Sequence, residues 1–314
     1  MNTLSVALKK YLALRRKLGS QLRGVDSGLQ DFVAFAKREG ASYITTDLAL
    51  RWAQEPAQAQ PVTWASRLRM VRCFAVWLSA TDRRTEVPPV GILPYRYRRQ
   101  PPYIYTDAEI AALIRAATRL ASPQGLRGRT YSTIFGLLSV TGMRVSEALA
   151  LDREDVDLEQ GILRIRRTKF GKSRLVLLHE STCQVLAAYA LARDRVVRRP
   201  PTAAFFLSER GTRVSGCATR YTFAKVSRAV GLRSPVLGRR HGHGPRLHDL
   251  RHRFAACTLV TWYRQGVDVE RELPKLAAYL GHAHVNDTYW YIEAVPELLE
   301  LATRRLEKRT EVKR

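Results

Sequence analysis

A proline- and arginine-rich segment most constrains how this chain can fold. Between Thr81 and Pro102 the sequence carries five prolines, at positions 88, 89, 94, 101 and 102. Proline has no backbone N–H and a fixed φ angle, so a run this dense forms neither a regular helix nor a central strand. Such segments are extended and semi-rigid. We therefore expect residues 81–102 to link two domains, 1–80 and 103–314, and 314 residues are enough for two cores.

Residues 1–80 carry apolar side chains at helical spacing in four stretches, which predicts a small helical bundle. Gly19 and Gly40 can end the first two helices. Thr46 can cap the third, and Pro61 precedes a fourth helix over about Val62–Leu78. The apolar positions are Leu4, Leu8, Tyr11 and Leu18, then Leu29, Phe32, Val33 and Ala36, then Leu48 and Trp52, and finally Leu68, Val71, Phe74, Ala75 and Leu78.

The second region is predicted to be mainly α, with one small three-stranded antiparallel sheet. Thr106 and Glu109 have the spacing of a capping box that opens its first helix. Short β-branched runs predict strands at 156–158, 162–165 and 175–178. Helices are expected near 180–195, 215–230, 248–264, 270–280 and 296–310. The fold class is therefore a helical N-terminal domain followed by a mixed α/β domain.

The charge of the chain indicates a polyanionic partner. A net charge of +25 and a pI of about 10.6 attract polyanions, and nucleic acid is the commonest one. A ribosomal or membrane-surface protein is also basic, but neither explains the ordered motifs described next. The four cysteines lie far apart, no apolar stretch is long enough to span a bilayer, and the N-terminus lacks the apolar core of a signal peptide. We expect a soluble, cytoplasmic, nucleoid-associated protein.

Four motifs follow one another through the second region. They are Thr141-Gly142-Met143-Arg144, His248-Asp249-Leu250-Arg251-His252, Leu280-Gly281-His282 and Tyr291. Two guanidinium groups, imidazoles and a phenol suit the attack of a phenolic oxygen on a phosphodiester. The planar fork of arginine donates two parallel hydrogen bonds to phosphate oxygens and stays charged. His248 and Arg251, three residues apart on a helix, share a face and can reach one phosphate.

These motifs resemble the tyrosine recombinase, or phage integrase-like, family over about residues 103 to 295. The resemblance implies that Arg144 and Arg251 clamp the scissile phosphate. It implies that His248 exchanges protons with the nucleophile or supports the phosphate, and that His282 hydrogen-bonds a non-bridging oxygen.

The same resemblance assigns the nucleophile. Tyr291 meets the family spacing from Leu-Gly-His and Tyr289 misses it, so Tyr289 is expected to be a half-buried packing residue. Glu147, three residues after Arg144, is expected to orient that arginine, a surface salt bridge being the alternative.

The family also keeps a catalytic lysine in the turn between the second and third strands, where it acts as general acid toward the leaving 5′ oxygen. This chain offers Lys169 and Lys172 there. Alignment of Arg174-Leu175-Val176 with the following strand of relatives favours Lys169. Lys172 is the alternative, and is otherwise expected to contact DNA.

Phosphate contacts are also expected from two arginine clusters, although a solvated charged face is an equal alternative for each arginine of the fourth helix. One cluster lies on the fourth helix and the other in the linker; they comprise Arg67, Arg69 and Arg72, and Arg96, Arg98 and Arg99. The pairs His241/His243 and His282/His284 lack a Cys or carboxylate cluster at ligand spacing, so no metal is expected. The resemblance implies no other cofactor, because the covalent link between tyrosine and DNA keeps the bond energy.

The resemblance implies a site-specific recombinase that cuts and rejoins double-stranded DNA through a 3′-phosphotyrosine and a Holliday junction. Its partners would be paired, inverted-repeat half-sites and three further protomers. The sequence of residues 168–174 is closer to that of transposon-borne recombinases. Some such elements encode several different recombinases, so a hetero-oligomer with related recombinases is also possible. The amphipathic tail from Pro296 would dock in a neighbour or on its own domain. A type IB topoisomerase and a catalytically silent DNA-binding relative remain the alternatives.

Overall fold

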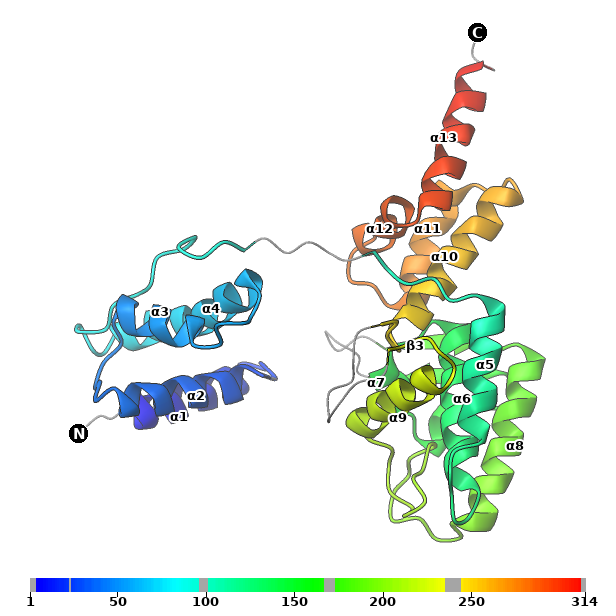
Figure 1. The fold of residues 1–314 in the computed structure, drawn as a ribbon, viewed down its shortest axis with the longest axis horizontal. Coiled ribbons are helices and arrows are strands. Elements are labelled where there is room, and N and C mark those ends of the chain that lie inside the picture. The colour runs from blue at the N-terminus through cyan, green and yellow to red at the C-terminus, as the bar shows by residue number, and fades with distance from the viewer. Residues whose placement is uncertain (1–3, 23, 96–100, 167–172, 235–243, 312–314) are drawn as a thin grey trace. The chain divides into compact units, whose positions relative to one another are not determined.

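The computed structural model describes residues 4–22, 24–95, 101–166, 173–234 and 244–311. The chain divides into two units, Met1–Gln100 and Pro101–Arg314, each of which forms its own core (Figure 1). Helices dominate both units, and the second also contains a three-stranded antiparallel sheet. The predicted fold class is therefore confirmed.

Four helices form the described part of the N-terminal unit: α1 (Leu4–Lys17), α2 (Val25–Arg38), α3 (Thr46–Gln54) and α4 (Pro61–Ser79). Their apolar faces meet around Trp52 and Phe32, whose rings pack edge-on with centroids 5.3 Å apart. Two details differ from the sequence prediction. Thr45, not Thr46, caps α3, because its Oγ1 accepts a hydrogen bond from the backbone N of Leu48. Leu18 lies beyond the end of α1 and is 72% exposed.

The segment after α4 packs on this unit as irregular chain with turns. Val87 and Leu93 contact the apolar core of the four helices. Glu86 makes two hydrogen bonds to the same unit. Its backbone N donates to Ile44 O at 2.8 Å, and its carboxylate accepts from the backbone N of Thr46. The packed unit thus extends past residue 80, to at least Leu93.

The C-terminal unit is built around α6 (Leu126–Thr141), which is buried on nearly all sides. It packs against α5 (Asp107–Thr118), α8 (Glu180–Val196) and α10 (Asp249–Arg264). The predicted capping box is confirmed at the start of α5, where Thr106 and Glu109 exchange side-chain and backbone hydrogen bonds. The remaining helices are α7 (Val145–Ala150), the 3-10 turn η1 (Arg153–Asp155), α9 (Gly216–Ala229), α11 (Val269–Leu280), α12 (Asn286–Ala294) and α13 (Pro296–Glu311).

The small sheet has the strand order β1-β2-β3, with both pairs antiparallel: β1 (Val156–Asp157), β2 (Ile162–Ile165) and β3 (Arg174–Leu177). Leu163 lies opposite Val156 on one side and Val176 on the other, which places all three on one register line. Leu163 and Val176 are fully buried, whereas Leu175 and Leu177 on β3 are exposed. One face of the sheet therefore covers the core.

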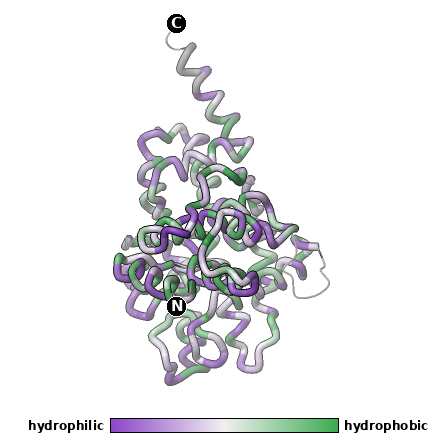
Figure 2. The backbone as a smooth tube through the Cα atoms, turned by 90° about the vertical axis from the view of Figure 1, so that its left-hand side faces the viewer, coloured by the Kyte–Doolittle hydropathy of each residue, from purple (hydrophilic) through white to green (hydrophobic). Residues whose placement is uncertain are grey.

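Helices α10 to α13 enclose a second apolar cluster in this unit. Leu298 of the tail helix α13 is fully buried in it, and Glu297 pairs with Arg264 of α10 at 2.6 Å. Apolar and polar residues alternate along α13 (Figure 2), as an amphipathic helix requires. The first turn of α13 thus packs on the domain to which it belongs. Within the described ranges, helices long and apolar enough to cross a membrane are absent.

Candidate active site

The first of the four motifs forms a tight turn between α6 and α7. Gly142 ends α6 with φ of +60°, a left-handed conformation that favours glycine. A Cβ atom there would lie 2.5 Å from Cδ1 of Phe254, so the position also lacks room for a side chain. The chain then leaves the turn in an extended conformation at Arg144, the N-cap of α7.

Arg144 is held by one carboxylate and one backbone carbonyl. Its Nη1 donates to Glu147 Oε1 at 2.8 Å, and its Nη2 donates to Gly281 O at 2.8 Å. The other oxygen of Glu147 accepts from the backbone N of Arg144 at 2.9 Å. Glu147 is only 6% exposed, so this is a buried contact and not a surface salt bridge.

Arg251 lies deeper, on the first turns of α10, and is 3% exposed. Its Nη1 donates to Gly142 O and its Nη2 to Leu280 O, both at 2.8 Å. Burial, and then the charge of Arg144, lower the pKa of Arg251 to about 10, so it stays protonated at neutral pH. The carbonyl-bearing C-terminal ends of α6 and α11, which carry partial negative charge, thus hold both cations.

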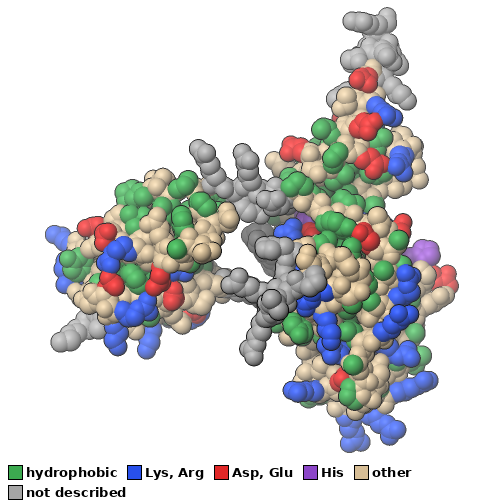
Figure 3. Space-filling view, in the orientation of Figure 1, with side chains coloured by type: hydrophobic (Ala, Val, Ile, Leu, Met, Phe, Trp, Pro, Cys, Tyr) green, Lys and Arg blue, Asp and Glu red, His purple; other side chains and the backbone are tan. Residues whose placement is uncertain are grey.

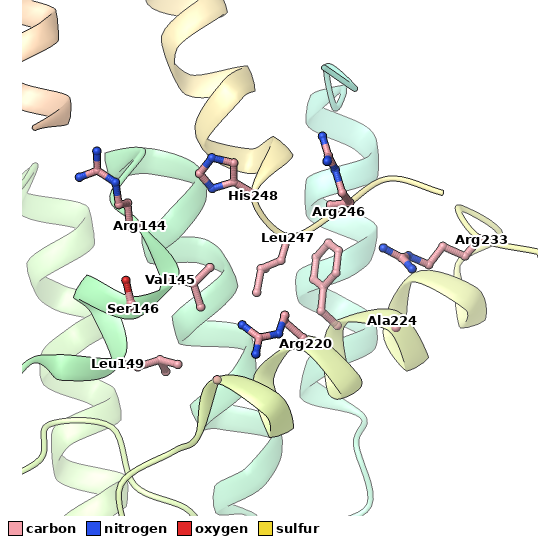
Figure 4. A pocket seen from close by; sticks show the side chains of 12 residues that line it. Arg144, Val145, Ser146, Leu149, Arg220, Ala224, Arg233, Arg246, Leu247 and His248 are labelled. Carbon is pink, nitrogen blue, oxygen red and sulfur yellow. The ribbon is translucent and has the colours of Figure 1, made fainter. Parts of the chain in front are cut away.

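His248 is the N-cap residue of α10. It shares a pocket of about 460 Å³ with Arg144, and the two side chains lie along one rim (Figure 4). Partial loss of hydration, and then the charge of Arg251, lower the pKa of His248 to about 4. The residue as a whole is nevertheless exposed to solvent. Its ring is therefore neutral at physiological pH and can accept a proton.

Tyr291 of α12 is buried, at 1% exposure, and its hydroxyl lies 3.0 Å from Nδ1 of His252. The phenol is also close enough to Arg251 to raise the pKa of that arginine by electrostatic interaction. On the far side of His252, Nε2 lies 3.9 Å from a carboxylate oxygen of Asp249. Tyr289, in contrast, is 44% exposed.

His282 follows the left-handed Gly281 that ends α11. Its Nδ1 lies 2.7 Å from Oγ1 of the buried Thr288, and its ring stacks on that of Tyr291 with a centroid distance of 6.4 Å. The motif Leu280-Gly281-His282 therefore contributes two carbonyls to the arginines and an imidazole beside the tyrosine.

Two residues of this cluster were missed from the sequence. His252 stands inside the second motif, but only the fold shows that it, and not His248, contacts Tyr291. Arg174, at the start of β3, contacts Glu147 through both terminal nitrogens. From the sequence, Arg174 is useful only for aligning β3 with the corresponding strand of relatives. An arginine in so basic a chain gives no indication of a specific role.

The remaining predicted residues are five that the structure does not describe and three on α4. Lys169, Lys172, Arg96, Arg98 and Arg99 fall outside the described residues. The guanidinium of Arg67 stacks 3.8 Å from the ring centroid of Trp52 and donates to Trp52 O, so it stabilises the helical bundle from within. Arg72 bonds Pro88 O, and Arg69 is exposed. A cluster of three or more His, Cys, Asp or Glu suited to a metal does not occur in the described part of the chain.

Arginines also surround the pocket beside Arg144. Arg220 projects from α9 into it, and Arg246 and Arg233 line its other side (Figure 4). On the face shown in Figure 3, lysine and arginine side chains outnumber acidic ones over much of the C-terminal unit. The pocket thus combines a neutral histidine with several cations, a composition suited to an anionic ligand.

Residues 104–297 match the model of the phage integrase family. A Sinorhizobium fredii protein described as integrase/recombinase y4rB is 47% identical over 315 residues, covering 99% of each chain. Tyrosine recombinase XerD of Bifidobacterium longum is 33% identical and covers 87% of this chain and 82% of its own. The chain therefore belongs to the phage integrase family of tyrosine recombinases.

Solved structures share the fold. A XerH recombinase bound to a palindromic difH substrate has a TM-score of 0.64 at 18% identity, covering 91% of this chain and 80% of its own. The Tn1549 transposon integrase, solved with transposon end DNA, has a TM-score of 0.60 at 14% identity, with coverage of 96% and 98%.

Proposed function

We propose that this protein is a site-specific DNA recombinase in which Tyr291 attacks a phosphodiester of duplex DNA. The oxygen of Tyr291 forms a bond to phosphorus, and the bond from phosphorus to the 5′ oxygen breaks. The products are a 3′-phosphotyrosine and a free 5′ hydroxyl, which can attack in reverse. The observation that carries the proposal is the meeting of Arg144, Arg251 and Tyr291 at the ends of α6 and α11.

Each side chain has a role that its surroundings support. Arg144 and Arg251 neutralise the non-bridging oxygens, and their backbone acceptors fix them before DNA arrives. His282 adds a hydrogen bond to the phosphate, and the neutral His248 can take up a proton. Lys169, or else Lys172, is proposed to protonate the leaving 5′ oxygen.

The burial of Tyr291 has a consequence for this reaction. A phenol that is 1% exposed cannot meet a phosphate that enters from solvent. Attack therefore requires the hydroxyl to leave His252 and α12 to shift. In this structure, the hydroxyl of Tyr291 is held inside the domain beside His252.

DNA would lie across the cationic pocket, with Arg220 and Arg246 contacting phosphates next to the cleaved one. Arg69, Arg72 and the arginines at 96, 98 and 99 would extend the contact from the first unit.

A lambda integrase tetramer has been solved on a Holliday junction, at a TM-score of 0.59. By analogy we propose a homotetramer on paired inverted half-sites, or a hetero-oligomer with related recombinases. The protein would act at the nucleoid, in integration or transposition.

Covalent attachment tests the proposal. DNA recovered with the protein from cells and sequenced would supply the half-site, which is then made as a nicked suicide duplex. Wild type and Tyr289→Phe should form a covalent adduct, whereas Tyr291→Phe should bind the duplex equally well and form none. An adduct mapped to Tyr289 would refute the assignment. Relaxation of any plasmid would favour a topoisomerase, and binding without an adduct would favour a silent relative.

A further inference from the structure

Arg174 makes three side-chain hydrogen bonds within this cluster, and the reaction above leaves it without a role. Its Nη1 and Nη2 donate to the two carboxylate oxygens of Glu147, at 3.0 and 2.7 Å. Its Nε donates to Tyr279 O at 2.7 Å. The Arg174 side chain is 12% exposed and that of Glu147 is 5% exposed, so the pair is largely removed from water.

Glu147 therefore stands between two arginines. One oxygen accepts from Nη1 of both Arg144 and Arg174, and the other accepts from the backbone N of Arg144 and from Nη2 of Arg174. A carboxylate with two lone pairs on each oxygen is fully used by four such donors. The orientation of Arg144 is thus linked to the position of Arg174 through one rigid group.

The third motif, Leu280-Gly281-His282, lies against both Arg144 and Arg174. A Cβ atom at Gly281 would lie 2.7 Å from Nη1 of Arg174 and 3.4 Å from Nη1 of Arg144. Gly281 also has φ of +70° and offers its carbonyl to Arg144. Both guanidinium groups pack against the backbone of this glycine, so the end of α11 is a surface on which they are arranged together.

We propose that Arg174 is a positioning residue for DNA cleavage, which fixes the carboxylate of Glu147 and through it the phosphate-binding orientation of Arg144. The inference rests on the function proposed above. It differs from a simple contribution of positive charge, because a charge alone does not require the two-point contact with Glu147.

The pKa of Glu147 offers a way to detect this positioning role of Arg174. Burial raises the pKa of Glu147, but the hydrogen bonds from Arg174 and then those from Arg144 outweigh it and hold the pKa below its usual value. Without Arg174, burial would be opposed by fewer donors, and the pKa should rise. A protonated Glu147 accepts less strongly from Arg144, so cleavage should fall at mildly acidic pH.

The test compares Arg174→Met and Arg174→Lys with Arg164→Met. Arg164 lies on the neighbouring strand β2 and contacts Glu154 O and Asp157 instead of the site. Single-turnover adduct formation on the suicide duplex, half-site affinity and melting temperature would be measured from pH 5 to 8. Misplacing a catalytic group by about 1 Å can cost roughly 100-fold in rate, so Arg174→Met should slow adduct formation by about 10- to 100-fold.

Half-site affinity should change by less than about threefold, as expected when the loss falls on the transition state. Arg174→Lys should remain slow, although it keeps the charge, and Arg164→Met should behave as wild type. The acid limb of the rate profile should move to higher pH in Arg174→Met and disappear when Glu147→Gln is added. Carboxyl NMR of Glu147 should report a raised pKa in Arg174→Met without reference to activity.

Three outcomes would overturn the inference: normal rates in Arg174→Met, full rescue by lysine, or an unchanged Glu147 pKa. If Arg174→Met does not fold, Arg174→Lys carries the same comparison. Failure of the wild type itself to form an adduct would remove the proposed function, and this inference with it. A wild type that cleaves beside an Arg174→Met variant that cleaves equally well would remove the inference alone.

Discussion

Replacing Gly142 by alanine would measure how tightly the turn between α6 and α7 is constrained. The left-handed φ of +60° costs a residue with a Cβ roughly 1–2 kcal/mol. The new Cβ would also lie 2.5 Å from Cδ1 of Phe254 and 3.2 Å from Cδ2 of Leu280, and relieving such overpacking costs roughly 1–3 kcal/mol. The two effects together destabilise the C-terminal unit by about 2–5 kcal/mol.

Gly125 provides the matched control at the other end of α6. It has φ of +72°, but no heavy atom of the described residues lies within 4 Å of a Cβ built there. Gly125→Ala should therefore show the backbone cost alone, about 1–2 kcal/mol. Since 1 kcal/mol lowers the melting temperature of a unit of this size by roughly 2–4 °C, we expect losses of roughly 4–20 °C for Gly142→Ala and 2–8 °C for Gly125→Ala.

Calorimetry of the full chain would measure both variants, with the transition of the C-terminal unit followed separately. Because Gly142 O accepts a hydrogen bond from Arg251, folded Gly142→Ala should also cleave the suicide duplex more slowly than Gly125→Ala. Equal losses of stability in the two variants would refute the packing argument. Equal cleavage rates would show that Arg251 does not depend on the position of this turn.

Two further predictions follow from the site. Partial desolvation and Arg251 lower the pKa of His248 below 6.5, so the unfolded chain takes up its proton at higher pH than the folded one. This histidine should therefore make stability fall as pH drops from 6.5 toward 4, and His248→Asn should flatten that slope; an NMR titration midpoint for His248 at or above 6.5 would contradict this. Cleavage should also proceed in excess chelator, because arginines supply the charge that metals supply elsewhere. Loss of cleavage in chelator, with recovery on adding zinc or magnesium, would count against the mechanism.

Local signals in the sequence located the helices that have one exposed face. The stripes of α2 and α4 and the capping box at Thr106 are such signals, because an amphipathic helix must alternate apolar and polar residues. Helix α6 was not predicted, since it is buried on nearly all sides and its apolar and small polar residues follow no single stripe. Helix α12 was missed as well, because it is only nine residues long and so too short to show a clear helical period.

In the site, too, the residues that belong to local motifs could be predicted and their distant partners could not. Arg144, Arg251, His248, His282 and Tyr291 could be named in advance, because their motifs are local and ordered. Their partners could not, since each contact joins residues far apart in the chain: Gly142 O with Arg251, or His252 with a tyrosine 39 residues later. The burial of Tyr291 likewise depends on how α10 and α12 pack, which no spacing rule reports.

The backbone acceptors of the two arginines bear on how such a site can change over evolution. Arg144 and Arg251 rest on the carbonyls of residues 142, 280 and 281, and every amino acid at those positions supplies a carbonyl. Apart from Glu147, which contacts Arg144, and Arg174, which contacts Glu147, side chains around the arginines can therefore diverge while the two cations keep their places. The constraint falls instead on the path of the main chain, and hence on the two glycines whose positive φ angles set that path. A lineage could thus acquire a new DNA target by changing the surface arginines without rebuilding its centre for cleavage.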